Sequence, residues 1–429
     1  MSLRIGNAQG FWGDRPAAPV EMVSRMPDLD YLTLEYLAEL SLSIMAAQRA
    51  ADSSLGYARD LVGTIDRLAP FWKDGARFKL VTNGGGLEPR ACALACREVL
   101  ARHGVRKTIG IVSGDNVLGR IDDAPHPLDT ANAYLGAAPV AEALALGADI
   151  VITGRIADPS LVVGPCMHEF GWSLDDLDRL AGATIAGHLL ECGAQSTGGM
   201  STHWMEIPDP AGNGYPVAEM EADGSFVLTK PPGSGGEVSL RTVKEQLLYE
   251  IGDPDHLVTP DVIVSFLSLA LTGDGPDRIR VTGAKGKPAP DAYKVSCSYP
   301  DGFRCDAMLA LHTHDAAAKA RRLGEVILDR VRAQGFRLDR TRIEVIGDGA
   351  CTDGLPSSVP LSEAVLRVSA AAHDRRALEC FSREIAPTVG NGPAGVTGYA
   401  TGRPKIRPVF GYHPAFIAKH EVSPTVEIL

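Results

Sequence analysis

Short apolar runs alternate with segments of helical periodicity from the start of the chain to about residue 190. Several runs, such as I-G-I-V and D-I-V-I, are apolar throughout, which is typical of parallel strands buried on both faces under crossover helices. The pattern therefore predicts an α/β domain built on a doubly wound, mainly parallel sheet. Five runs are predicted as its strands: Leu3–Ile5, Tyr31–Glu35, Phe78–Thr82, Thr108–Val112 and Asp149–Thr153. The helices between them are predicted over Tyr36–Ala50, Tyr57–Phe71, Pro89–His103 and Pro127–Leu146.

The second half of the chain shows strands of alternating polarity and a hairpin pattern. Polar residues alternate with apolar ones at Val217–Glu221 and Phe226–Lys230, which indicates strands with one solvent face. Ala292–Tyr299 and Phe303–Leu311 flank a Pro-Asp-Gly turn and are predicted to pair as a hairpin. A helix is predicted next, over Ala316–Gln334.

These patterns predict two domains, because hairpins packed on helices are typical of α+β folds. A chain of 429 residues also exceeds the usual size of a single core. We expect an α/β domain with a ligand cleft over residues 1–200 and a smaller α+β domain over residues 201–429. The boundary is expected anywhere between residues 195 and 260.

Composition is that of an ordinary globular protein, with 45% apolar and 22% charged residues. A net charge of -11 argues against nucleic acid as a partner, since phosphate binding needs a basic surface. The start M-S-L-R-I-G-N-A-Q-G lacks a secretory signal, and no apolar segment reaches the roughly 18 residues of a membrane span. We therefore expect a cytoplasmic protein without a membrane partner. The eight cysteines lack CxxC spacing, so no metal site is predicted.

Polar, glycine-bearing turns follow four of the five predicted strands. The carboxyl ends of parallel strands meet at one edge of a sheet, where ligands bind. This edge is therefore predicted to form the substrate site. The residues concerned are Asn7, Gln9, Gly10 and Asp14 after the first strand; Asn83, Gly84, Gly85 and Gly86 after the third; Ser113, Gly114, Asp115 and Asn116 after the fourth; and Thr153, Gly154, Arg155 and Asp158 after the fifth.

Two interpretations of these turns stay open. Glycines beside a helix N-terminus let an anionic ligand approach peptide N–H groups, but glycines also serve merely to turn the chain. Arg155 is predicted to clamp a carboxylate or phosphate; the alternative is an ion pair with Asp158 or Asp122. Asp115 or Asp14 is predicted to move a proton; the alternative for each is a helix cap.

The segment E-C-G-A-Q-S-T-G-G from Glu191 to Gly199 carries a thiol, an amide and hydroxyls. Cys192 is a candidate nucleophile if its thiol ionises, and a plain buried cysteine otherwise. The other polar positions are predicted to bind substrate: Gln195, Ser196, Thr197, Gly198 and Gly199. No nucleotide cofactor is predicted, because N-G-G-G-L-E-P lacks the Lys-Ser/Thr of a phosphate loop and I-G-N-A-Q-G-F-W-G departs from the dinucleotide fingerprint.

Six segments together resemble the acyclic terpene utilisation AtuA-type family, over nearly the whole chain. They are G-N-A-Q-G-F-W-G-D, V-T-N-G-G-G, S-G-D-N, V-I-T-G-R-x-A-D-P-S, E-C-x-x-Q-x-T-G-G and T-V-K-E-Q-L-L-Y-E-I-G-D-P. The resemblance implies a role in the breakdown of citronellol-like acyclic terpenes and branched carboxylic acids, which pass through CoA thioesters. Longer members append a small ferredoxin-like domain. This chain ends soon after F-G-Y-H-P and is expected to lack that domain, so a separate ferredoxin-like subunit could complete its site.

The leading hypothesis is a catabolic enzyme acting on a carboxylic acid or acyl-CoA, as a hydro-lyase or a C–C lyase. CoA would enter as part of the substrate, and no other cofactor is expected. A homo-oligomer is expected as well. Two alternatives are a non-catalytic ligand-binding or scaffold subunit that works with a ferredoxin-like partner, and a nucleotide-dependent enzyme.

Overall fold

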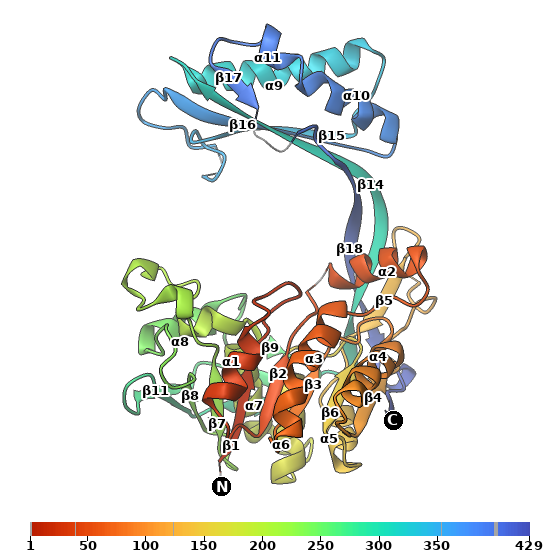
Figure 1. Cartoon of the computed structure of the whole chain (residues 1–429), viewed down its shortest axis with the longest axis vertical. Helices are drawn as coiled ribbons and strands as arrows, with labels where there is room; N and C mark the ends of the chain where they lie inside the picture. Colours follow the sequence, from red (N-terminus) through yellow and green to blue (C-terminus); the bar gives the residue numbers. More distant parts are fainter. Residues whose placement is uncertain (1, 39, 123, 353, 399–401) are drawn as a thin grey trace. The chain divides into compact units, whose positions relative to one another are not determined.

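The computed structural model describes residues 2–38, 40–122, 124–352, 354–398 and 402–429. The chain divides into two compact units (Figure 1). The first unit contains Met1–Ser298 and Tyr412–Leu429, and the second contains Tyr299–Gly411. The expected boundary, between residues 195 and 260, falls inside the first unit.

A ten-stranded sheet forms the centre of the first unit. Its five middle strands run parallel to one another and confirm the five strands predicted from the sequence. In sheet order they are β1 (Leu3–Asn7), β2 (Tyr31–Leu34), β3 (Lys79–Thr82), β6 (Ile150–Thr153) and β4 (Ile109–Ser113).

Antiparallel strands extend this sheet on both sides, so the sheet is mixed rather than mainly parallel. Next to β1 follow β7 (Val217–Met220), β8 (Phe226–Thr229), β12 (Ile279–Thr282) and β11 (Ala270–Gly273), and next to β4 lies β19 (Thr425–Ile428). The strands predicted at β7 and β8 do form. They join the large sheet, however, because β7 pairs with β1 in the register Ile5↔Ala218.

Helices cover both faces of the sheet and create two separate cores (Figure 1). Neighbouring strand residues point to different cores: Leu80 belongs to one and Val81 to the other. This explains why the strands are apolar throughout. One core contains α1 (Ala18–Arg25), α2 (Ser41–Ala51), α3 (Arg59–Lys73) and α4 (Pro89–Arg102). The other contains α5 (Ala138–Ala145), α6 (Ser160–Phe170), α7 (Leu177–Glu191) and α8 (Leu240–Leu248).

The three glycines after β3 allow the chain to pack closely on its neighbours. A Cβ on Gly84 would lie 2.9 Å from Leu61, and one on Gly85 would lie 2.5 Å from the carbonyl oxygen of Thr153. Gly86 has φ +52°. The bare backbone at this strand end is therefore explained by packing between the β3 and β6 loops.

We expect Gly85→Ala to destabilise the first unit by about 1–3 kcal/mol, because the new methyl group overlaps a backbone carbonyl that cannot rotate away. The control is Gly63→Ala in α3, where a Cβ meets nothing within 4 Å. That change should stabilise the helix by about 0.5–1 kcal/mol. Urea denaturation measures both, and equal effects of the two substitutions would contradict the packing role.

The second unit has the ferredoxin-like order β-α-β-β-α-β. Its antiparallel sheet has the order β15-β16-β14-β17, and both long helices pack on one face of it (Figure 1). This unit lies between the two parts of the first unit, so it is not the appended domain that the resemblance concerned; the expected lack of such a domain and the separate ferredoxin-like subunit both stay predictions. The elements are β14 (Ala292–His312), α9 (Ala316–Ala333), β15 (Arg340–Ile346), β16 (Glu363–Ala372), α10 (Arg375–Ile385), α11 (Thr388–Asn391) and β17 (Val396–Gly398).

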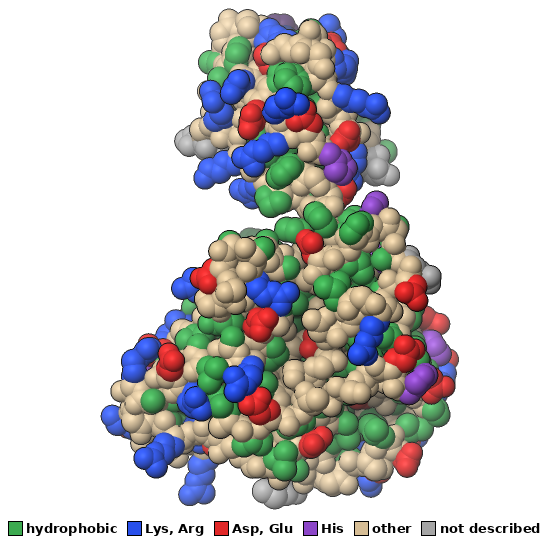
Figure 2. All heavy atoms as spheres, turned by 90° about the vertical axis from the view of Figure 1, so that its right-hand side faces the viewer, with side chains coloured by type: hydrophobic (Ala, Val, Ile, Leu, Met, Phe, Trp, Pro, Cys, Tyr) green, Lys and Arg blue, Asp and Glu red, His purple; other side chains and the backbone are tan. Residues whose placement is uncertain are grey.

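The sheet face opposite these helices is stabilised by ion pairs. Arg367 forms ion pairs with Glu344 at 3.0 Å and with Asp306 at 3.3 Å. Figure 2 shows that Lys and Arg side chains are frequent on the visible surface of this unit. None of the helices in the described part of the chain combines the length and apolar character that a membrane span needs.

Two predicted elements are wrong. The expected hairpin is one continuous strand, β14, because its halves pair with different partners. Val295–Ser298 pairs with β5 (Thr130–Ala133), and Phe303–His312 pairs with β16. The segment Pro127–Leu146, predicted as one helix, instead contains the strand β5 and the short helix α5. The remaining elements include a small sheet of β9 (Leu257–Val258), β10 (Ile263–Ser265) and β13 (Lys285–Lys287), and the long β18 (Ile406–Ala418) paired with β14.

Candidate functional site

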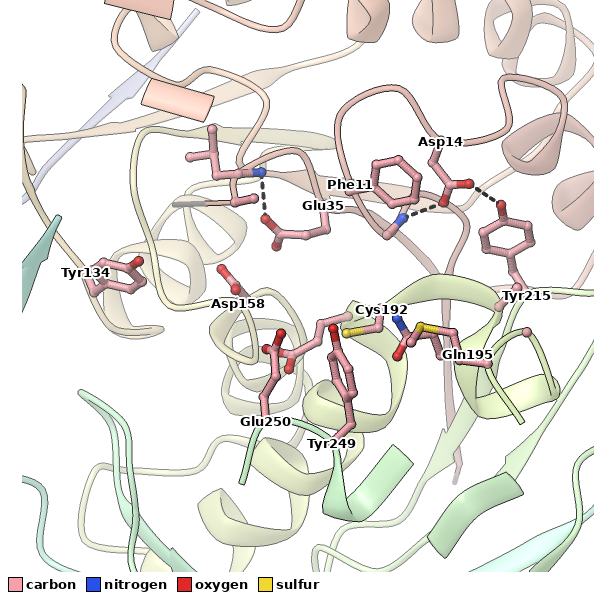
Figure 3. Close-up of a pocket in the computed structure, with 17 residues that line it drawn as sticks. Phe11, Asp14, Glu35, Tyr134, Asp158, Cys192, Gln195, Tyr215, Tyr249 and Glu250 are labelled. Carbon is pink, nitrogen blue, oxygen red and sulfur yellow. Dashed lines mark hydrogen bonds between the residues drawn. The ribbon is translucent and has the colours of Figure 1, made fainter. Parts of the chain in front are cut away.

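A cavity of about 400 Å³ lies in the first unit beyond the carboxyl ends of β1, β2 and β6. Loops after these strands form one wall, and the segments after α7 and α8 form the other (Figure 3). A crevice in this place is what the strand-end argument leads one to expect. The side chains that decide its chemistry are Asp14, Glu35, Tyr134, Asp158, Glu191, Cys192, Gln195, Tyr215, Tyr249 and Glu250.

The lining of this cavity is acidic. Five carboxylic side chains contribute to it, and none of the described lining residues is Lys, Arg or His. A ligand group with negative charge would meet like charges at short range in a partly dry environment. The cavity therefore suits an uncharged reacting group better than the anion expected from the glycine turns. Those carboxylic residues are Asp14, Glu35, Asp158, Glu191 and Glu250.

Arg155 lies buried behind the cavity wall, where each of its three guanidinium nitrogens donates to an acceptor of the protein. Nε donates to the carbonyl of Ile156 at 2.9 Å, and Nη1 donates to the carbonyl of Leu37 at 2.8 Å. Nη2 forms an ion pair with Asp158, and the guanidinium lies 4.2 Å from the ring centroid of Tyr134. Arg155 thus holds three lining residues, which is the ion-pair alternative considered for it.

Glu35 lies at the end of β2 with its carboxyl group at the cavity. Oε1 accepts a hydrogen bond from the backbone N–H of Leu37 at 2.9 Å and another from Asn83 Nδ2. Oε2 has no partner among the described residues. Burial raises the pKa of Glu35 to about 7, against the opposing effects of Arg155 and of these two donors. A carboxyl group of this pKa with a free oxygen is suited to donate and accept protons near neutral pH.

Glu191 supplies a second carboxyl group at the cavity, and its environment differs from that of Glu35. Oε1 lies 3.0 Å from His188 Nδ1, and Oε2 has no partner among the described residues. His188 Nε2 donates to the carbonyl of Gln246 at 2.9 Å, so its protonated form satisfies both neighbours. Burial lowers the pKa of His188, but Glu191 and the Gln246 carbonyl outweigh burial and raise it overall. Glu191 thus pairs with His188, and the charge of Glu191 contributes to the raised pKa of Glu35.

Asp14 lines the cavity but holds its own loop. Oδ2 accepts from the N–H of Gly10 at 2.9 Å, and Oδ1 accepts from the N–H of Arg15 and from the Tyr215 hydroxyl, both at 2.6 Å. Burial and the Asp14 carboxylate raise the pKa of Tyr215. These contacts fix the turn after β1, and they engage both carboxylate oxygens of Asp14, whereas Oε2 of Glu35 has no partner among the described residues.

Asp115 lies away from the cavity. Its Oδ2 accepts from Asn132 Nδ2 at 2.7 Å and from the N–H of Arg155 at 3.0 Å. Burial raises the pKa of Asp115, with these two hydrogen bonds opposing it. Asp115 thus joins β5 to the loop after β6.

The structure brings some of the predicted site residues together and leaves others outside. Gly10, Asp14, Asp158, Cys192, Gln195 and Gly199 line the cavity. Those that do not are Asn7, Gln9, Asn83, Gly84, Gly85, Gly86, Ser113, Gly114, Asp115, Asn116, Thr153, Gly154, Arg155, Ser196, Thr197 and Gly198. Several of these form internal bonds instead; Asn7 Nδ2, for example, donates to the carbonyl of Leu190 at 2.6 Å.

Cys192 lines the cavity as a protonated thiol. Burial, followed by the charge of Glu191, raises the pKa of Cys192 to about 12. Only about one thiol in ten thousand would be ionised at pH 8. The site therefore does not activate Cys192 as a nucleophile.

Iodoacetamide at pH 8 should accordingly label the exposed Cys351 long before Cys192. Peptide mapping by mass spectrometry after timed quenching measures both rates. Unfolded protein serves as the control, since both cysteines should then react alike. Labelling of Cys192 in the folded protein as fast as Cys351 would show that its thiol is activated.

The sequence argument missed Glu35, Glu191, Tyr249 and Glu250. Glu35 carries a detectable signal, because it ends the apolar run Y-L-T-L and the strand-end rule applies to that strand as well. Glu250 carries none: it has φ +61°, an unusual conformation for a residue other than glycine. Across the described residues, no three His, Cys, Asp or Glu side chains group in a way that would hold a metal ion.

The chain matches the model of the family described as acyclic terpene utilisation family protein AtuA over residues 3–428. No curated protein matches it, and no solved structure does.

Proposed function

Because the chain belongs to the acyclic terpene utilisation AtuA family, we propose that it is a cytoplasmic catabolic enzyme that adds water to, or removes water from, the CoA thioester of a branched acyclic acid. Membership of the family implies involvement in acyclic terpene utilisation. The reaction and the thioester are our inference from the cavity.

The observation that carries this proposal is the buried carboxyl group of Glu35, with a pKa of about 7 and an oxygen free of partners. Glu191 offers a second free oxygen in the same cavity, paired on its other side with His188. A carboxyl group whose pKa is raised, beside a second carboxyl group with a free oxygen, is an arrangement suited to an acid and a base acting together.

In the dehydration direction, the Glu191 carboxylate would take the proton from the carbon next to the thioester carbonyl. Protonated Glu35 would give its proton to the departing hydroxyl group on the adjacent carbon. The C–H and C–O bonds break, a C=C bond forms and water leaves, so atoms and charges balance. Cleavage of the C–C bond in a β-hydroxy thioester is the alternative reaction: a base would take the hydroxyl proton, and an acid would protonate the enolate carbon that the cleavage leaves.

The acidic lining supports a thioester over a free acid as substrate. A thioester carbonyl is neutral, whereas a free carboxylate would add a further negative charge to a cavity lined by five carboxylic residues. A thioester also makes the neighbouring C–H group more acidic than a carboxylate does.

In the test, the purified protein is incubated in D2O with matched pairs of branched acyclic acids and their CoA thioesters. Deuterium should enter the carbon next to the carbonyl of the thioester and not that of the free acid, as read by mass spectrometry. Binding of thioesters without any exchange or turnover would favour a non-catalytic ligand-binding subunit. Exchange with free acids alone would overturn the choice of substrate.

A further inference from the structure

A second cavity of about 330 Å³ adjoins the one described above. The two share Tyr134, Asp158, Glu191 and Glu250 in their linings, so the cavities are direct neighbours. Together they lie within the range of about 300–1,000 Å³ that is usual for ligand sites. A ligand that reacts at Glu35 and Glu191 can therefore extend into the second cavity.

The second cavity is mostly apolar beyond the shared residues. Ile251 after α8, two residues of β9 and an aromatic ring on β18 contribute to it. Val258 is 51% exposed and Phe416 is 74% exposed, so apolar surface is left open to solvent here. The apolar side chains at its wall include Ile251, Leu257, Val258, Pro260, Ala292 and Phe416.

Polar groups in this lining are largely engaged with the protein itself. Thr259 Oγ1 donates to the carbonyl of Val262 at 2.7 Å and accepts from its N–H at 3.1 Å. Both ring nitrogens of His188 are bonded as well. Lys294 is an exception, with Nζ 5.0 Å from the ring centroid of Tyr134. The cavity thus offers few partners for a chain rich in amides and is better matched to hydrocarbon.

We propose that the second cavity binds the aliphatic chain of the substrate, with the chain passing between Glu191 and Glu250 from the reacting centre. This assignment rests on the proposed function, since it takes the acidic cavity as the place of reaction. The competing occupant is the amide-bearing arm of CoA, with a phosphate near Lys294.

Binding of 1-alkanols of four to ten carbons, measured by titration calorimetry, tests the assignment without any turnover. Affinity should rise about fourfold for each added methylene until the cavity is full. Val258→Glu should weaken 1-octanol by at least about tenfold, because it places a carboxylate against the chain. The matched control is Leu146→Glu: Leu146 is 56% exposed and does not line either cavity, so binding should not change.

The outcomes distinguish a failure of the chain site from a failure of the proposed reaction. Affinity that does not depend on chain length, or an equal effect of both substitutions, would overturn the chain site. The chain site would also be overturned if pantetheine, the arm of CoA without its phosphates, displaced bound 1-octanol at concentrations at which butanol does not. If alkanols bind as expected while thioesters undergo no exchange, the chain site stands and the proposed reaction fails.

Discussion

Replacing Glu35 by Gln is expected to lower kcat by about two to four orders of magnitude and, at the same time, to make the folded protein more stable at pH 8. The loss of rate follows from the role proposed for Glu35 in proton transfer, since Gln has no proton to exchange. The shape of the site should survive, because a Gln Oε1 can still accept from the N–H of Leu37 and from Asn83.

The gain in stability follows from the raised pKa. The carboxyl group of Glu35 has an ordinary value of 4.5 in the unfolded chain and a pKa of about 7 when folded. Between these values the folded state binds a proton that the unfolded state has lost, so the free energy of unfolding falls as pH rises. Above pH 7 ionisation of the buried Glu35 lowers the free energy of unfolding by its full amount, on the order of a few kcal/mol. Gln is uncharged and avoids it.

Urea denaturation at pH 4.5 and at pH 8 measures this effect, and the exchange reaction proposed above measures kcat. The wild-type protein should lose stability relative to Glu35→Gln between the two pH values. Asp115 and other buried acids act equally in both proteins, so the difference isolates Glu35. Glu142→Gln, at an exposed position of α5, is the control and should change neither quantity. An active Glu35→Gln protein would remove Glu35 from the reaction, whatever its stability.

Replacing Arg155 by Met should destabilise the first unit by about 3–5 kcal/mol. The guanidinium is 1% exposed and bonds two carbonyl groups and the Asp158 carboxylate. Met would leave these acceptors without donors in a buried place, and each unmet polar group carries its own penalty. Arg155 also lowers the pKa of Glu35, so its loss should move the pKa of Glu35 further above its present value.

Two further substitutions separate charge from geometry at this position. Arg155→Lys keeps the positive charge but lacks the forked donors, so it should lose stability while shifting the pH–rate profile less than Met does. Arg179→Met is the control, since Arg179 forms an exposed pair with Asp176, and it should cost no more than about 1 kcal/mol. The buried network would be refuted if Arg155→Met were no more costly than Arg179→Met.

The parallel centre of the sheet and the position of the cavity could be predicted from the sequence, because both depend on local patterns. Runs such as I-V-I-T present apolar residues to both faces of a sheet. The carboxyl ends of parallel strands meet at one edge of the sheet, and this does not depend on the rest of the chain. Which strand-end side chains face the cavity depends on packing. Asn83 is turned into the protein by its bonds to Glu35 and to the N–H of Tyr36, and no pattern near Asn83 reveals this.

The wrong predictions arose where pairing between distant segments overrides a local signal. Pro300-Asp301-Gly302 is a strong turn signal, yet the strand continues through it because β5 and β16 bind its two halves. Gly302, with φ +74°, accommodates the bend. The acidic character of the cavity was missed for a similar reason, since its five carboxylic residues come from segments that are up to 236 positions apart, from Asp14 to Glu250.

The ferredoxin-like unit begins after Ser298 on β14 and ends before Tyr412 on β18, and these two strands pair with each other. The chain therefore leaves the first unit along β14 and returns to it along β18, and these are paired strands like the two strands of a hairpin. In terms of chain connection the second unit takes the place of the loop of a long hairpin. Such a loop can be exchanged, enlarged or reduced to a short turn while the ten-stranded sheet and its cavity keep their own connections.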